Sequence, residues 1–534
     1  MTPIELGIFA SRLEAVCEEM GAVLRNAAFS PNIRDRLDFS CAVFDASGRL
    51  CAQAAHIPVH LGSMAYAMAD LVAGRAWDQG DMVILNDPFL GGTHLPDLTL
   101  IAPVHAQGQL AGFVVNRAHH ADIGADSPGS MPVSRCIHDE GQVIAPRLLV
   151  RAGVLELDWL EAFTARLRNP RDGSGDFLAQ IAANRAGATR LREVIGGQGL
   201  AQFSAGLDAL NGYGERLART ALSQIPHGAY AFADMMDDDG QGTRDIRLRA
   251  KVIVGREGVS IDFSGTAAQV PGNINCPLPV TAAAVFYVFR CLMPPQTPAC
   301  AGAFRPIRLL APAGCLLNAR YPAAVAAGNV ETSTRVVDLL LGALAQAIPD
   351  LIPAASHGSM NNLAMGSARA GAAWDYYETI GGGMGAGPAG GGLSGVQTHM
   401  TNTLNTPIEV LEGRYPLRVL RYGLRPGSGG AGTSPGGDGL VRQLEFLAPA
   451  TVTLLGERRT HKAWGLAGGQ AGASGRHLHN GRELPGKVAL EVAAGDRLTV
   501  ETPGGGGWGP GTPSRLEKPR AGPDFDAQVT TRLQ

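Results

Sequence analysis

The chain carries, in sequence order, the motifs Asn86-Asp87-Pro88-Phe89-Leu90-Gly91-Gly92-Thr93-His94-Leu95-Pro96-Asp97 and Asn116-Arg117-Ala118-His119-His120-Ala121-Asp122. Between them lie two apolar segments, 97–104 and 110–116, separated by His105-Ala106-Gln107-Gly108-Gln109. Two apolar runs around a short glycine-containing link predict a β-hairpin, in which Gly108 can adopt a positive φ. A turn at Gly108 places Asp97 and His119 opposite each other at the open end of the hairpin, with His94 one turn upstream.

The residues at this open end predict a divalent metal site. Two imidazoles and one carboxylate on a rigid hairpin can hold such an ion and leave positions open for water or substrate. The plainer interpretation is that these side chains cap turns around the glycine loop. Further ligand-type residues between Asp87 and Asp126 favour metal binding, and we therefore predict His94, Asp97 and His119 as ligands. Zinc, manganese and iron(II) all accept nitrogen and oxygen ligands, so the residues leave the metal open.

Other histidines and an aspartate lie close to these ligands in sequence. His120 and Asp122 follow the hairpin directly, and their position predicts proton-transfer groups or partners that orient the ligands. His56 and His60 lie upstream in the segment 56–62, and in a strand they would face the same side. We expect either of these two to contact substrate or metal, or else to be buried and hydrogen-bonded.

Length and composition are compatible with a multidomain enzyme, and nothing in them requires a membrane or nucleic acid. A chain of 534 residues exceeds one typical core and predicts two or more domains. The formal net charge of −3 requires neither nucleic acid nor an anionic membrane as partner. No apolar run reaches the roughly 18 residues of a membrane span, and the N-terminus lacks the pattern of a signal peptide. The 8 cysteines form no Cys-x-x-Cys pair, which indicates reduced thiols and a cytoplasmic location.

The hydrophobic periodicity predicts an α+β chain in two regions. Residues 1–225 are expected to form a mixed helix and strand region that carries the metal-binding hairpin, and residues 226–518 a glycine-rich, β-rich region. Residues 519–534 form a polar tail. Helices are predicted at 3–27, 64–73, 176–184 with a continuation to 223 after one break, 281–291 and 333–348. Strands are predicted at 39–45, 50–53, 82–85, 230–234, 246–254 and 259–263.

Two short motifs imitate catalytic signatures without their structural context. The segment 481–487 matches most of a P-loop, but Val488 replaces the required Ser or Thr and a strand pattern follows where a helix is needed. The segment 432–436 matches a nucleophile elbow but lies in a Gly/Pro loop. The glycine segments 381–385 and 504–507 could present N–H groups to an anion, although tight turns are the simpler expectation. With no nucleotide signature left, any ATP is expected to bind another subunit.

Several sequence blocks resemble the hydantoinase B/oxoprolinase family, the β-type subunits of ATP-dependent cyclic-amide hydrolases, which are related to acetone carboxylase subunits. The resemblance runs from about residue 3 to about residue 512. The blocks that carry it are Ser30 to Cys41, His56 to Met64, Asn86 to Asp97, Asn116 to Gly124, Asp262 to Thr266, Asn402 to Glu412 and Gly504 to Gly509.

The resemblance implies a specific division of labour. A partner subunit of the hydantoinase A type, an ATPase, would phosphorylate the substrate carbonyl, and this chain would complete the chemistry in a hetero-oligomer. In the carboxylase relatives a His-x-x-Asp motif and a following His bind a divalent metal, manganese first, and the resemblance places these ligands at His94, Asp97 and His119. One departure stands out: the segment Gly429 to Gly437 lacks the arginine that family members carry after Ser-Gly-Gly-Ala-Gly, which could shift substrate or mechanism.

The resulting hypothesis is the catalytic subunit of an ATP-dependent hydrolase that opens a cyclic amide such as a hydantoin, 5-oxoproline or a lactam. In it the metal acts as a Lewis acid and His120 or Asp122 as general base. One alternative is a subunit of an ATP-dependent carboxylase of the acetone or acetophenone type. The other is a non-catalytic scaffold subunit whose metal only braces the hairpin.

Overall fold

The N-terminal part of the chain is built on the predicted hairpin. The computed structural model describes residues 1–54, 57–369 and 373–511. In it a 7-stranded sheet has the order β2-β1-β5-β4-β3-β6-β7, and every neighbouring pair is antiparallel. Its strands are β1 (Phe39–Asp45), β2 (Leu50–Gln53), β3 (Met82–Leu85), β4 (Asp97–Ala106), β5 (Gln109–His119), β6 (Arg147–Arg151) and β7 (Val154–Leu155). The hairpin β4–β5 therefore lies at the centre of this sheet.

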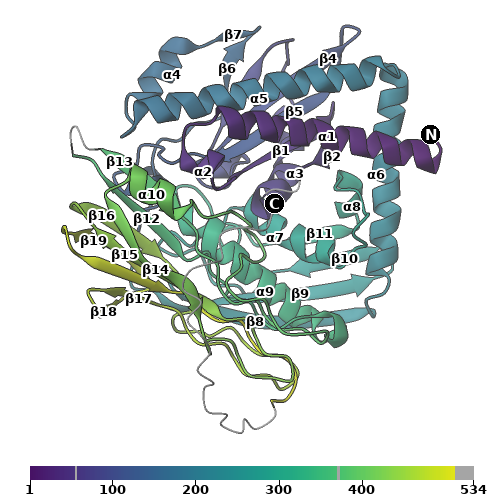
Figure 1. Ribbon diagram of the computed structural model, residues 1–534. Helices are drawn as coiled ribbons and strands as arrows, with labels where there is room; N and C mark the ends of the chain where they lie inside the picture. The colour runs from purple at the N-terminus through teal and green to yellow at the C-terminus, as the bar shows by residue number, and fades with distance from the viewer. Residues whose placement is uncertain (55–56, 370–372, 512–534) are drawn as a thin grey trace.

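Helices cover both faces of this sheet, because its strands are apolar on both sides. The helices α1 (Pro3–Ala27) and α5 (Pro170–Gly196) lie side by side across one face (Figure 1). Leu98, Leu100 and Val114 point toward them in one core. Alternate residues of the same strands, such as Ile101 and Val115, pack in a second core with α3 (Pro58–Val72). The other described α-helices of this part are α2 (Pro31–Arg34), α4 (Leu157–Thr164) and α6 (Leu200–Leu222), and its loops contain the 3-10 turns η1 (Pro88–Leu90), η2 (Pro128–Ser130) and η3 (Ile137–Glu140).

A second sheet of 4 strands, in the order β11-β10-β9-β8, follows α6. Its members are β8 (Gly228–Asp238), β9 (Arg244–Gly255), β10 (Gly258–Asp262) and β11 (Ile307–Leu310), of which only β10 and β11 pair in parallel. The helices α7 (Leu278–Cys291) and α9 (Ser333–Leu344) pack in its core, with the short α8 (Ala301–Phe304) nearby. A π-helical turn, η4 (Gly328–Thr332), leads directly into α9.

The C-terminal part forms two antiparallel sheets that share a third core, drawn green to yellow in Figure 1. Their strand orders are β13-β12-β16-β19 and β14-β15-β20-β17-β18. The bounds are β12 (Asn362–Ser367), β13 (Trp374–Glu378), α10 (Ile408–Arg414), β14 (Leu417–Arg425), β15 (Gly439–Phe446), β16 (Ala450–Leu455), β17 (Arg476–His479), β18 (Arg482–Leu484), β19 (Lys487–Val492) and β20 (Arg497–Glu501).

Glycine is abundant because several loops of this part stack backbone against backbone. A Cβ added at Gly383 would lie 1.9 Å from the Gly437 carbonyl oxygen, and one at Gly504 would lie 1.9 Å from that of Ser428. The N–H groups of Gly383 and Gly505 donate to the carbonyls of Pro503 and Gly437. These N–H groups are bonded to neighbouring loops, which matches the simpler expectation of compact packing.

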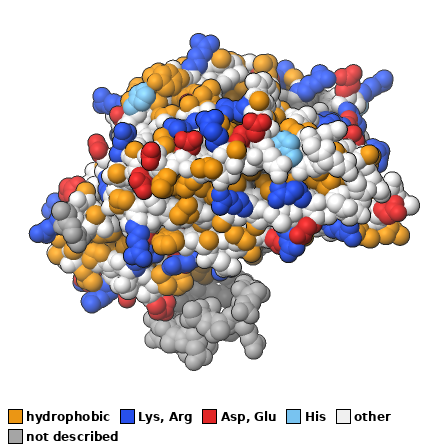
Figure 2. Space-filling model, turned by 90° about the horizontal axis from the view of Figure 1, so that it is seen from above, with side chains coloured by type: hydrophobic (Ala, Val, Ile, Leu, Met, Phe, Trp, Pro, Cys, Tyr) orange, Lys and Arg blue, Asp and Glu red, His pale blue; other side chains and the backbone are white. Residues whose placement is uncertain are grey.

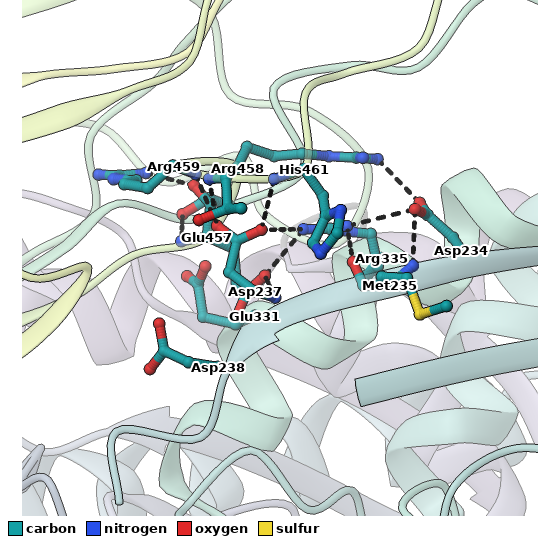
Figure 3. Close-up of polar contacts among 12 residues, drawn as sticks. Asp234, Met235, Asp237, Asp238, Glu331, Arg335, Glu457, Arg458, Arg459 and His461 are labelled. Atoms are coloured by element: carbon teal, nitrogen blue, oxygen red, sulfur yellow. Dashed lines mark hydrogen bonds and ion pairs between the residues drawn. The ribbon is translucent and has the colours of Figure 1, made fainter. Parts of the chain in front are cut away.

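A buried cluster of ion pairs ties the second sheet to the C-terminal sheets (Figure 3). Glu457 accepts from Arg335 of α9 at 2.8 Å, from Lys487 of β19 at 2.6 Å and from the N–H of Asp237 at 2.9 Å. The side chains of Glu457, Arg335 and Lys487 are all fully buried. Arg458, from the same loop as Glu457, pairs with Asp338 at 2.7 Å. Charges from α9, the loop that contains Glu457 and Arg458, and β19 thus neutralise one another in the interior.

The α+β class predicted from sequence is confirmed, with corrections at the ends of elements. The helix expected to start at Asp176 starts at Pro170, capped by Asn169, and Asp176 is buried within it. The predicted break is present at Gly197 to Gly199, before α6. The expected helix 64–73 begins at Pro58, so His60 lies in a helix rather than a strand. His56 and the tail 519–534 lie outside the described residues.

The two motifs that imitate catalytic signatures, at 481–487 and 432–436, lie in the local structures that the sequence predicts. Asn480 and Gly481 form the turn between β17 and β18, and Lys487 begins β19, where its ammonium pairs with Glu457. Ser434 lies in the stacked glycine loops, where it pairs with Trp508. Neither segment therefore has the strand–turn–helix geometry of its catalytic counterpart.

The state of the cysteines and the distribution of surface charge agree with what the composition predicts. All 8 cysteines are free. On the face shown in Figure 2, basic and acidic side chains are interspersed with apolar ones. Among the described residues, no helix combines the length and apolar character needed to cross a membrane.

Candidate metal centre

The turn between β4 and β5 brings two of the predicted ligands, Asp97 and His119, together. Gln107 and Gly108 have φ values of 53° and 74°, so these two residues make a tight turn between β4 and β5. The register that follows pairs Asp97 directly with His119. These two side chains therefore meet at the open end of the hairpin, as predicted.

The loop before β4 turns His94 toward the same point. The Asn86 side chain holds this loop, because it donates to the Leu95 carbonyl at 2.8 Å and accepts from the Ile144 N–H at 2.6 Å. Gly91 has a φ of 106°, and a Cβ at Gly92 would lie 2.5 Å from the Asn86 carbonyl oxygen. The two glycines thus permit a close turn that a larger residue would open.

Asp97 is the centre of a fully buried cluster. Its Oδ1 lies 3.1 Å from His94 Nε2 and 3.2 Å from His119 Nδ1. Its Oδ2 accepts from Thr93 Oγ1 at 2.6 Å and lies 3.3 Å from His60 Nε2. Each of His94, Asp97 and His119 offers one potential ligand atom, a ring nitrogen or a carboxylate oxygen, and these three atoms lie within 4.8 Å of one another.

The donor atoms fit a divalent cation. Within the part of the chain that the structure describes, neither ring nitrogen of His94 has a hydrogen-bond partner, although Nε2 lies close to the Asp97 carboxylate, and His119 Nε2 has none either. Buried polar atoms without partners carry a free-energy cost that a bound ion would remove. Two imidazoles and one carboxylate suit manganese, zinc or iron(II).

The electrostatics favour an ionised carboxylate among imidazoles. Burial opposes ionisation of Asp97, but His94 and His60 outweigh it and hold the pKa of this carboxyl well below its usual value. Burial lowers the pKa of His119. Burial also acts against the charged form of His94, yet the charge of Asp97 prevails and raises its pKa. Asp97 is therefore held ionised, which is the state in which a carboxylate binds a metal ion.

Residues from distant parts of the chain complete this site. Asn329, in the π-helical turn η4, brings Nδ2 to 3.5 Å from Asp97 Oδ2. Tyr377 of β13 stacks on the His119 ring, with centroids 4.8 Å apart and planes 12° apart. Arg36 lies over the Tyr377 ring at 5.1 Å. Sequence reasoning missed Asn329 and Tyr377 as members of the site, since no local motif marks them.

His120 and Asp122 face away from this cluster. Successive strand residues point to opposite sides, so His120 packs edge-on against Phe177 of α5 with centroids 4.9 Å apart. Asp122 accepts from the N–H groups of Gly124 and Arg168 at 2.8 and 2.7 Å. The end of β5 therefore separates both residues from the cluster of His94, Asp97 and His119.

The fold and the site together define an α+β protein with a buried cluster of two histidines and one carboxylate at the open end of a hairpin. The sequence model of the Hydantoinase B/oxoprolinase family matches residues 2–511 of this chain. The chain belongs to this family.

The curated relatives whose names describe an activity include a plant enzyme and a bacterial subunit. The 5-oxoprolinase 1 of Arabidopsis thaliana is 40% identical over 540 residues, which cover 95% of this chain and 42% of the relative. The B-type subunit of a putative D-/L-hydantoinase from Pseudomonas sp. (strain NS671) is 32% identical, with 95% of this chain and 90% of the relative covered. This chain thus spans about two fifths of the 5-oxoprolinase but nearly all of the hydantoinase subunit.

The solved structures that share the fold include two ATP-dependent enzymes. The ATP-dependent caprolactamase from Pseudomonas jessenii superposes with a TM-score of 0.88 at 28% identity, over 96% of this chain and 91% of that one. The nucleotide-free acetone carboxylase structure gives a TM-score of 0.86 at 19% identity, over 95% and 76%. The second likeness establishes the fold alone.

Proposed function

We propose that this chain is the catalytic subunit of an ATP-dependent cyclic-amide hydrolase, which acts on a carbonyl phosphorylated by a separate ATPase subunit. The single observation that carries the proposal is the buried His94–Asp97–His119 cluster with its unbonded ring nitrogens. It is supported by relatives named 5-oxoprolinase, hydantoinase subunit and caprolactamase.

The need for a partner is supported by the lengths of the relatives. The match leaves more than half of the Arabidopsis 5-oxoprolinase uncovered. In the hydantoinase, the matched relative is itself named as a subunit. We infer that an ATPase of the hydantoinase A type is this chain's partner, and that ATP binds to that partner.

Coupling to ATP answers a chemical difficulty. A planar amide is stabilised by resonance, and an unstrained five-membered ring favours its closed form. Phosphorylation of the carbonyl oxygen makes the carbon more electrophilic and couples ring opening to the release of phosphate. At this subunit water would attack the activated carbon and lose a proton, and the C–N bond would then break as the ring nitrogen takes up a proton. The acyl phosphate that remains is hydrolysed by a second water to a carboxylate and inorganic phosphate.

His94, Asp97 and His119 would hold the divalent ion, with manganese the first expectation. Such an ion, when bound, supplies Lewis-acid stabilisation of the developing negative charge and a more acidic water. The chain itself orients the ligands: Thr93 fixes one oxygen of Asp97, and Tyr377 holds the plane of the His119 ring. Burial of the whole cluster keeps bulk water from the reacting groups.

We assign the proton transfer to His60 rather than to His120 or Asp122. His60 Nε2 lies 3.3 Å from Asp97 Oδ2 and 4.0 Å from Asp38 Oδ1, on the side of the hairpin where the triad lies. His120 points to the opposite side, and Asp122 engages both carboxylate oxygens in hydrogen bonds to backbone N–H groups. An imidazole between two carboxylates can accept a proton and be stabilised as the cation.

Reconstitution tests the proposal. The purified chain, mixed with a hydantoinase A-type ATPase, is expected to open hydantoin, 5-oxoproline or caprolactam only when ATP is present, with one ATP consumed per ring opened. Each protein alone should be inactive. Ring opening without ATP would contradict the proposal. ATP consumption that requires a ketone and bicarbonate, with no ring opening, would replace it by the carboxylase alternative.

A further inference from the structure

One buried guanidinium, that of Arg117, connects the segments that carry the residues of the metal centre. Arg117 lies on β5, two positions before His119, and is 0% exposed. In the hairpin it pairs with Thr99, two positions along β4 from Asp97. Because alternate residues of a strand share one face, Arg117 and Thr99 project from the same face of the sheet as Asp97 and His119.

Three nitrogens of this guanidinium each donate to a different segment. Nε donates to Thr99 Oγ1 on β4 at 2.8 Å, Nη1 to Ser63 Oγ on α3 at 2.6 Å and Nη2 to the Gly91 carbonyl at 3.2 Å. Gly91 belongs to the loop that carries His94. Since the donors of a guanidinium form a rigid planar fork, one group sets the mutual positions of β4, α3 and this loop.

The hydrogen bond from Arg117 to Ser63 extends to the backbone at His60. Ser63 lies one turn after His60 in α3, and its Oγ lies 2.6 Å from the Val59 carbonyl oxygen and 3.0 Å from that of His60. The hydroxyl donates its one hydrogen to these carbonyls, and its oxygen accepts from Arg117. A single side chain, Ser63, therefore connects the guanidinium to the turn of α3 that carries His60.

The His60 ring depends on the position of α3 because it bridges two strands of the sheet. Its Nε2 lies 3.3 Å from Asp97 Oδ2 on β4, and its Nδ1 lies 3.4 Å from Ser40 Oγ on β1. Both distances are long for a hydrogen bond, so a small shift of α3 away from the sheet would break these contacts. Within the described residues, no side chain caps the start of α3 at Pro58.

We propose that Arg117 is a positioning residue, which holds His60 beside the metal ligands through Ser63. The inference rests on the proposed function, because it takes His60 as the proton acceptor of that reaction. A base must come within about 2.6–3.2 Å of the atom that gives up the proton, so its rate of proton transfer depends on where α3 places it. Loss of the link therefore lowers kcat while the metal ligands stay in place.

Two variants that each remove one hydroxyl acceptor from Arg117 test the proposal in the reconstituted complex. Ser63→Ala breaks the link to α3 and is expected to lower kcat about tenfold, with KM and metal content within about twofold of the parent. Thr99→Val breaks the link to β4 and should lower kcat by less than about threefold. Equal losses of kcat in the two folded variants would show a merely structural role and overturn the proposal.

A double-mutant cycle locates the effect at His60. In a His60→Gln background, which lacks the base, Ser63→Ala is expected to lower the remaining kcat by less than about twofold. Independent residues give additive losses, whereas residues that act through one another do not. A further loss of about tenfold in this background would contradict the assignment.

Arg117→Lys separates position from charge. It keeps the positive charge, but an ammonium lacks the planar fork that reaches three acceptors at once, so kcat should fall by about tenfold or more. Activity equal to the parent's would mean that the charge alone matters, which would overturn the proposal.

Hydrogen exchange of the backbone amides, measured by mass spectrometry, tests the positioning role without the reaction. In the purified chain, Ser63→Ala should exchange residues 59–64 of α3 about fivefold faster than the parent, with exchange in β4 and β5 unchanged. Equal protection of α3 in Ser63→Ala and the parent would contradict the inference. Faster exchange of α3 in a complex that opens no cyclic amide would support the position assigned to Arg117 and refute the proposed function.

Discussion

Replacing His94 with alanine is expected to lower ATP-dependent ring opening by the reconstituted complex about a thousandfold or more. His94 supplies one of the three ligands in the cluster found among the described residues, where its polar contact is with the ligand Asp97. With His94 removed, Asp97 and His119 alone would have to hold the ion. The rate of amide cleavage at saturating ATP, with circular dichroism to confirm folding, measures this effect.

The control for this variant is His138→Ala. His138 is exposed and contacts Tyr321 rather than the triad, so activity should stay within about twofold of the parent. Full activity in folded His94→Ala would show that the cluster has only a structural role. That result would support the scaffold alternative, in which a metal braces the hairpin without taking part in chemistry.

Replacing Glu457 with alanine is expected to cost about 3–5 kcal/mol of unfolding free energy. Glu457 is the common partner of Arg335 and Lys487, and all three side chains are fully buried. Without it, two positive charges remain in the interior close to each other. The midpoint of urea-induced unfolding, compared at equal slope, measures the loss.

An exposed pair of the same chemistry serves as the control. Glu257 and Arg308 are 3.7 Å apart with side chains 88% and 76% exposed, so Glu257→Ala should change stability by no more than about 0.5 kcal/mol. Glu457→Gln, which keeps hydrogen-bonding atoms but loses the charge, should fall between the two alanine variants. Equal stability of the two alanine variants would contradict the view that the buried cluster joins the second and C-terminal sheets.

The parts of the structure that could be predicted from sequence are those set by local rules. A two-residue turn at Gln107 and Gly108 fixes the register of β4 and β5, and this register alone brings Asp97 opposite His119. Amphipathic periodicity similarly located α1, since its buried residues recur at helical spacing.

Two kinds of feature could not be predicted from the sequence: the site residues that tertiary packing supplies and the first residues of two helices. Asn329 and Tyr377 join the metal centre from 232 and 258 positions beyond Asp97 and His119, and nothing local in the chain marks them. The start of α5 was missed because Gly173 and Gly175 weaken the helical pattern, although Pro170 after the cap Asn169 was a usable signal. Pro58 was an equivalent signal for α3 and would have placed His60 in a helix.

Elemental analysis of the purified chain, beside His94→Ala and His119→Ala, tests the central claim most directly. We expect close to one manganese, zinc or iron per parent chain and loss of that metal in both folded variants. A parent chain that contains no metal, and takes up none after incubation with these three ions, would contradict a metal centre at His94, Asp97 and His119.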